Sequence, residues 1–226
     1  YLASGDAGTP KTEWLEALLK VCMDLHLEKK AFKVIQSLVD KNEDDPRWWK
    51  ILAQFHLQQG DYKKAVAALK IHSYLVPIKK QDIILMGDLY NAIEVPVKAA
   101  EYYEKAVKFE KDRSAYEKLA AAYIAAHKPD KALNVLNQAL EEKSTSGLWF
   151  MMGRIRYEKE EFDKAYNAFK KSAQMDPKDG RAYLMMGYCA LQIHKKDAAR
   201  MAFQKATKFR DQRKRAKELL KELASL

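Results

Sequence analysis

The sequence is poor in residues that break helices and in residues that build covalent frameworks. Its 226 residues include only eight glycines, six prolines and two cysteines. Two cysteines cannot form a disulfide framework, and Cys22 and Cys189 lie toward opposite ends of the chain. Their apolar neighbours predict buried, unreactive thiols. Strand-like alternation of Val, Ile and Thr is also scarce, so the composition favours an all-α fold.

A long apolar run is missing too. The longest uncharged run, Ala182–Ile193, is far shorter than the roughly 20 residues that a membrane-spanning helix needs. We therefore expect no membrane span. The chain begins at Tyr1 and not at Met, which is consistent with a processed form or with a piece of a longer protein.

Motifs for catalysis and metal binding are absent as well. The sequence has no Walker loop, dinucleotide fingerprint or nucleophile elbow. The acidic pairs Asp44–Asp45 and Glu160–Glu161 fall at predicted turns, where helix capping explains them better than paired-carboxylate catalysis. Five histidines show no metal-ligand spacing to Cys, Asp or Glu: His26, His56, His72, His127 and His194. We expect no enzyme activity, no metal and no cofactor.

What the sequence does have is an internal repeat of 33 or 34 residues. Small residues recur at this spacing: Ala31, Ala65, Ala99, Ala132, Ala165 and Ala199. Four residues after each stands a large apolar residue: Ile35, Leu69, Tyr103, Leu136, Phe169 and Phe203. Upstream stands a residue that is small in five of six cases: Leu19, Ala53, Gly87, Ala120, Gly153 and Gly187. This pattern predicts helical hairpins in which a small residue on the first helix receives a large one from the second.

Turn signals set the boundaries of the repeats. Gly60, Pro96 and Pro129 suit turns inside hairpins, and Asp176–Pro177 suits a stop between them. The boundaries predict a lead-in at 1–11 and a single array at 12–212 with units 12–45, 46–79, 80–112, 113–145, 146–179 and 180–212. A capping helix at 213–226 follows, with an apolar stripe of Ala216, Leu219, Leu220 and Leu223 that should cover Ala199 and Phe203.

This pattern resembles the tetratricopeptide repeat (TPR) family. The family signature of an aromatic residue, Leu-Gly, Tyr, Ala, Phe and Pro is matched best by Trp149–Pro177. The resemblance implies a right-handed superhelical solenoid whose first helices line a concave groove, and a non-catalytic scaffold that binds a peptide or protein there. The first unit departs from the pattern at Leu15 and Leu19, and the second has His72 at an alanine site.

The residues that line the groove can be predicted: they are the first-helix residues that point away from their partner helix and from the next unit. The last two units combine aromatic residues with arginine, types enriched at binding hot spots. The predicted partner-binding residues are Lys50, Gln54, Asp88, Asn91, Phe150, Arg154, Tyr157, Arg181, Leu184 and Tyr188. The alternative is that some of these residues only pack against the neighbouring unit.

Lys50 and Gln54 also begin the pattern of the carboxylate clamp by which some family members hold chaperone C-termini. Asp88 stands where such a clamp needs a positive or amide group. We therefore do not expect a chaperone co-factor.

Charge is distributed unevenly along the chain. Residues 1–46 carry six basic and nine acidic groups, whereas residues 195–226 carry eleven basic and four acidic groups. The basic end suggests an alternative, a helical repeat that binds nucleic acid or anionic lipid through Lys208, Arg210, Arg213, Lys214, Arg215 and Lys217. No glycine-rich or stacking motif accompanies this charge, so a solvated capping helix explains it better.

A narrower resemblance concerns the setting of the protein. Val95–Ala100, Gly187–Ala190 and the basic Arg213–Arg215 segment are similar to bacterial repeat proteins that accompany TonB-type energy-transducing systems. That resemblance implies a periplasmic protein within an envelope or transport complex. A docking region of a larger enzyme is a further alternative, and a homo-oligomer is compatible with the sequence.

Overall fold

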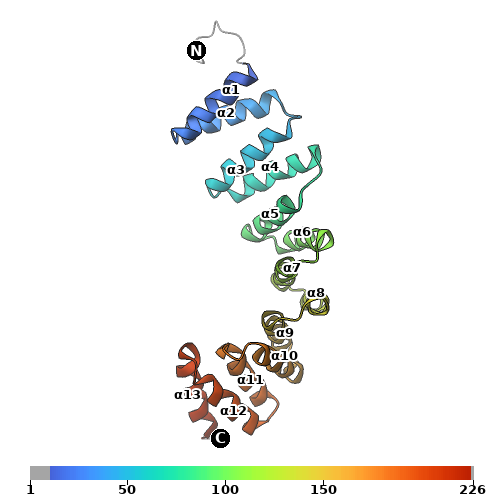
Figure 1. Ribbon diagram of the computed structural model, residues 1–226, viewed down its shortest axis with the longest axis vertical. Coiled ribbons are helices and arrows are strands. Elements are labelled where there is room, and N and C mark those ends of the chain that lie inside the picture. Colours follow the sequence, from blue (N-terminus) through green and yellow to red (C-terminus); the bar gives the residue numbers. More distant parts are fainter. Residues whose placement is uncertain (1–10, 225–226) are drawn as a thin grey trace. The chain divides into compact units, whose positions relative to one another are not determined.

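The computed structural model describes residues 11–224, and within this range the regular structure is helical, without strands (Figure 1). The helices are α1 (Thr12–Asp24), α2 (Glu28–Lys41), α3 (Pro46–Gln58), α4 (Tyr62–Leu75), α5 (Lys80–Ala92), α6 (Pro96–Phe109), α7 (Arg113–Ala125), α8 (Pro129–Glu142), α9 (Ser146–Glu158), α10 (Phe162–Met175), α11 (Gly180–Gln192), α12 (Lys196–Ala206) and α13 (Arg210–Ala224). The all-α helical repeat fold predicted from the sequence is confirmed. Residues 1–10 of the predicted lead-in at 1–11, and residues 225–226 of the predicted capping helix at 213–226, lie outside the described residues.

Each first helix ends in the same kind of turn. A residue with positive φ, between 53° and 71°, stands between the two helices of a hairpin at His26, Gly60, Glu94, His127, Glu160 and His194. The next N–H then donates to a carbonyl five residues back, as from Lys128 N to Tyr123 O at 2.8 Å. This Schellman-type bond reverses the chain and starts the second helix antiparallel to the first.

Within the hairpins, glycines receive aromatic rings. A Cβ at Gly153 would lie 2.7 Å from the Phe169 ring, and a Cβ at Gly187 would lie 2.2 Å from the Phe203 ring. No side chain larger than hydrogen fits there, so the two helix backbones approach closely. The predicted pairing of small and large residues is confirmed at these positions, and at Gly87 beneath Tyr103.

The chain forms two compact units, Tyr1–Ala106 and Val107–Leu226, with the boundary inside α6. In the first unit, one cluster joins α1 and α2 to Trp48 of α3, and another joins Leu69 of α4 to Leu89 of α5. In the second unit, Phe169 of α10 packs with Cys189 of α11. Within each unit, therefore, the second helix of one hairpin packs on the first helix of the next.

The capping helix lies where its apolar stripe predicted. Leu219 and Leu223 of α13 pack with Ala199 and Phe203 of α12. The helix begins at Arg210 rather than Arg213, because Arg213 N already donates to Phe209 O at 2.9 Å in a helical turn.

Both thiols are buried, as predicted, with Cys22 2% exposed and Cys189 fully buried. Loss of hydration raises the pKa of Cys189 to about 12. A thiol that stays protonated at neutral pH is a poor nucleophile.

Candidate functional site

In the first unit, two predicted groove residues make specific contacts inside the protein. Lys50 of α3 donates to both carboxylate oxygens of Asp82 of α5, at 2.8 and 3.0 Å. The Asp82 side chain is only 8% exposed, whereas that of Lys50 is 37% exposed. The pair therefore neutralises Lys50 locally and links the first helices of successive hairpins. Sequence reasoning missed Asp82, because its charge is unusual at a position that is buried in the neighbouring repeats.

The acidic groove residue predicted in this unit, Asp88, is also engaged. Asp88 accepts a hydrogen bond of 2.6 Å from the hydroxyl of Tyr103 on α6. Burial, together with this bond to a carboxylate, raises the pKa of Tyr103 well above its ordinary value. Gln54 and Asn91 are exposed on α3 and α5.

In the second unit, the structure places the predicted aromatic residues against the second helices. The Phe150 ring meets the Phe169 ring edge to face at 5.3 Å, and Tyr157 meets Phe162 in the same way at 5.4 Å. Both residues remain partly exposed. Each ring is thus fixed by packing and still presents part of its surface, so packing and binding are compatible roles for these residues.

Arg181 is held over one of these rings. Its guanidinium carbon lies 5.0 Å from the centroid of Phe150, a cation–π distance. Its Nε and Nη2 atoms donate to Asp179 at 2.9 and 2.7 Å, while its backbone N–H donates to the same carboxylate at 2.9 Å. These bonds to Arg181 hold the pKa of the Asp179 carboxyl below its ordinary value. Asp179 therefore caps α11 and positions the guanidinium at once.

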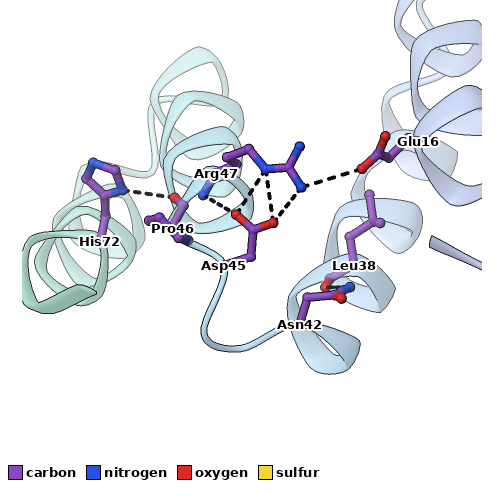
Figure 2. Close-up of polar contacts among 7 residues, drawn as sticks. All are labelled: Glu16, Leu38, Asn42, Asp45, Pro46, Arg47 and His72. Atoms are coloured by element: carbon purple, nitrogen blue, oxygen red, sulfur yellow. Dashed lines mark hydrogen bonds and ion pairs between the residues drawn. The ribbon is translucent and has the colours of Figure 1, made fainter. Parts of the chain in front are cut away.

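The first unit contains the same arrangement of a capping aspartate that also binds an arginine two residues later. Asp45 caps α3 through Arg47 N at 2.9 Å and accepts from the Arg47 guanidinium at 2.6 to 3.1 Å (Figure 2). There the arginine also reaches Glu16 of α1, at 3.8 Å. The Asp-x-Arg spacing thus orients an arginine at the start of a first helix in both units.

The capping helix contributes one more arginine to this region. Arg215 Nε of α13 donates to the hydroxyl of Tyr188 at 2.8 Å, and its guanidinium lies 6.0 Å from the centroid of the Tyr188 ring. Leu184 is half-buried against the cluster that includes Leu219. Sequence reasoning had assigned Arg215 only to a basic tail. The apolar stripe that contains Ala216 and Leu219 could have indicated that Arg215 lies close to the array, because Arg215 borders this stripe.

We call the resulting set the aromatic–arginine surface: Phe150, Arg154, Tyr157, Arg181, Leu184, Tyr188 and Arg215. Arg154 is its least constrained cation, with a side chain 60% exposed and only a distant ion pair of 3.8 Å to Glu158. Beside Arg181 opens a pocket of about 350 Å³ that is lined also by Lys178, Lys208 and Arg210. The chemistry on offer is recognition of anionic groups and of apolar or cationic side chains by aromatic faces.

Other kinds of site find little support in residues 11–224. No group of three or more His, Cys, Asp or Glu side chains in this range could hold a metal ion. None of the helices described is long and apolar enough to cross a membrane.

Comparison with known proteins assigns the family. Two tetratricopeptide repeat family models match the chain, one over residues 156–223 and one over residues 30–72. The chain belongs to the tetratricopeptide repeat family. The first of these matches extends into α13, so the capping helix shares the repeat pattern. TPR proteins in general act as protein–protein interaction scaffolds and typically carry no enzymatic activity of their own.

Similar proteins include one curated relative and two solved structures. The Tetratricopeptide repeat protein 21 homolog of Caenorhabditis elegans is 24% identical over 127 residues, which cover 56% of this TPR chain but only 10% of the relative. The crystal structure of MamA has a TM-score of 0.64 at 23% identity and covers 72% of this chain and 90% of its own. That of YrrB, described as a TPR protein with an unusual peptide-binding site, has a TM-score of 0.63 at 18% identity and covers 83% of this chain and 97% of its own. These structures share the fold with the TPR chain.

Proposed function

We propose that this TPR protein is a non-catalytic scaffold that binds an acidic peptide segment on the aromatic–arginine surface. The observation that carries the proposal is the contact of Arg215 with Tyr188, at 2.8 Å. It brings a third arginine, from α13, to a surface that already holds Arg154 and Arg181. Charge-assisted hydrogen bonds to carboxylates, supported by partly exposed rings, are a recurring basis of peptide recognition.

Two side chains of the site are held in place, and a third can change its conformation. Asp179 holds Arg181 in place, and packing holds Phe150, so neither loses much conformational freedom on binding. Arg154 has only a distant partner and can turn toward a ligand. Peptide binding by YrrB, a protein of similar fold, supports a peptide as the ligand class.

The proposal is tested with synthetic peptides that have free C-terminal carboxylates. One set is rich in Asp and Glu, and a matched set carries Asn and Gln instead. We expect the acidic set to bind preferentially, and Arg154→Ala and Arg215→Ala each to raise the Kd of a selected peptide about tenfold in calorimetry, as loss of a charge-assisted bond predicts. Tyr188→Phe keeps the ring but removes the hydroxyl that positions Arg215, so it should weaken binding less.

The matched control is Arg200→Ala, an exposed arginine of α12 outside the aromatic–arginine surface. Its Kd should stay within about twofold of the parent protein, and the melting temperature of Arg154→Ala should match that of Arg200→Ala. Equal binding of both peptide sets, or equal affinity for all variants, would overturn the proposal. Tight binding of duplex DNA with a steep dependence of log Kd on log salt would favour the nucleic-acid alternative.

We further propose a bacterial envelope or transport complex as the setting. The support is the similarity of Val95–Ala100 and Gly187–Ala190 to repeat proteins of TonB-type systems. Release of the native protein by osmotic shock, with a cytoplasmic marker retained, is the expected result. Retention with the cytoplasmic marker would contradict this setting, and the complete reading frame would reveal whether an enzyme domain adjoins the array.

A further inference from the structure

One position changes its exposure between the first hairpin and the others. Val21 of α1 is 50% exposed. At the same place in the repeat, later first helices carry Phe55, which is half-buried, and four residues that are at most 3% exposed: Leu89, Ala122, Ile155 and Cys189. Val21 is therefore an apolar residue at a position that is elsewhere shielded from water.

The structure shows what shields these counterparts. Phe55 stacks on Phe32 of α2 with ring centroids 5.2 Å apart. Leu89 packs with Leu69 of α4. Cys189 packs with Phe169 of α10. In each case the covering residue comes from the second helix of the preceding hairpin, which α1 lacks among the described residues.

Val21 belongs to a continuous apolar stripe on the outer face of α1. Trp14 is 51% exposed and Leu25, the C-cap residue of α1, is 62% exposed, and with Val21 they stand at i, i+7 and i+11 along one side of the helix and its cap. The stripe differs from the one that faces α2, which consists of the buried Leu15, Leu19 and Cys22. The counterpart of Trp14 one repeat later, Trp48, is 4% exposed within the cluster formed by α1 and α2.

The two ends of the array are therefore built differently. The exposed residues of α13 are almost all charged, so its outer face is well solvated. The outer face of α1 instead presents large apolar side chains, a kind of patch that marks an interaction surface.

We propose that the outer face of α1, defined by Trp14, Val21 and Leu25, is the seat of the second helix of a further tetratricopeptide hairpin. The occupant chemistry follows from the counterparts: an amphipathic helix with an apolar stripe like that of α2. Charge agrees with this assignment. Acidic Glu13 and Asp24 are exposed near the two ends of the stripe, and second helices of this chain carry exposed lysines. The exposed face of α13, being charged, cannot cover it.

The test uses the full chain with residues 12–45 duplicated in tandem, so that residue 45 of the first copy is followed by residue 12 of the second. Residues 12 and 46 occupy the same place in the repeat, at the start of α1 and of α3. In the duplicated chain the second copy of α1 therefore follows a copy of α2, just as α3 follows α2 in the parent chain. We expect the duplicated chain to melt at a higher temperature. Val21→Glu should shift the melting temperature by less than about 2 °C in the parent chain, but by about 6 °C or more in the inner copy, where it would bury a charge.

Met201→Glu is the control, since Met201 is 60% exposed on α12 and should behave alike in both chains. Three outcomes would overturn the proposal. An equal effect of Val21→Glu in both chains would show that no helix seats on the stripe. A large effect already in the dilute parent chain would show that another segment of the same chain covers it. A concentration-dependent dimer in sedimentation, abolished by Val21→Glu, would make a second copy the occupant.

Discussion

The ring of His72 on α4 contacts the backbone of α3, with Nδ1 lying 2.9 Å from the carbonyl oxygen of Pro46 (Figure 2). Because a carbonyl only accepts, Nδ1 carries the proton. Ser172 makes the same contact in another hairpin, where its Oγ donates to Ser146 O at 3.0 Å. Three further hairpins have alanine at this position: Ala106, Ala139 and Ala206. A polar residue is tolerated at this buried site because the first carbonyl of the partner helix is within reach.

Ser172→Ala should lower the free energy of unfolding by about 1 kcal/mol, the usual value of one such hydrogen bond. His72→Ala should cost more, about 2 kcal/mol or above, because it also leaves a cavity where a buried ring was. Urea unfolding followed by circular dichroism measures both. If Ser172→Ala is as stable as the parent, the hydrogen bond of Ser172 contributes nothing to stability.

Gly153→Ala should destabilise the protein by about 1–3 kcal/mol, because the added methyl would overlap the Phe169 ring. Gly147→Ala on the same helix is the matched control. Its methyl meets nothing closer than 3.9 Å, so it should be neutral or stabilising by up to about 1 kcal/mol. Equal stability of the two variants would contradict the close packing of α9 and α10.

His127→Gly should raise the free energy of unfolding by about 0.5–1 kcal/mol, because His127 holds a φ of 56° that glycine adopts without a Cβ penalty. His127→Ala keeps the Cβ and should bring no such gain. Gly60→Ala tests the reverse change at φ 71° and should lose about 1 kcal/mol. Thermal unfolding of the three variants checks the set, and a gain for the alanine variant at His127 would point to the imidazole rather than the backbone.

Acid should destabilise the protein partly through His56. Burial lowers the pKa of His56 below its ordinary 6.5, with Lys64 acting in the same direction and Asp61 opposing it. As pH falls, the unfolded chain therefore takes up this proton first. The contribution of His56 to stability is fully present above the pKa of this ring in the unfolded chain, and it is lost as pH falls through the pKa of the ring in the folded protein.

The measurement is the free energy of unfolding of the parent and of His56→Gln between pH 8 and pH 5. The parent should lose more stability over this range than the variant, which lacks the titrating ring. Identical pH profiles would show that His56 titrates alike in both states.

The fold could be predicted because its rule is local and repeated. Gly153 with Phe169 and Gly187 with Phe203 follow from a spacing that recurs along the chain, and each copy of the pattern reduces the chance of error. The candidate site was predictable in part for the same reason. Helical register placed Phe150, Arg154 and Tyr157 on one helix.

Partners of these residues were beyond sequence reasoning. That Asp82 rather than a ligand meets Lys50 depends on how α3 and α5 pack. That Arg215 reaches Tyr188 depends on where α13 docks. Both contacts join residues about one repeat apart in sequence, and only the packing of helices brings such side chains within hydrogen-bond distance.

The sequence by itself determined the helical hairpins, the residues that close them and the apolar stripe of the capping helix, because these follow from periodicity within and between repeats. The tertiary structure alone decided which apolar residues are covered. Val21 and Leu89 are equivalent in the repeat, yet one is 50% exposed and the other 3%. The physical reason is that burial at this position is supplied by the preceding hairpin, and no property of the residue itself reveals whether that hairpin is there.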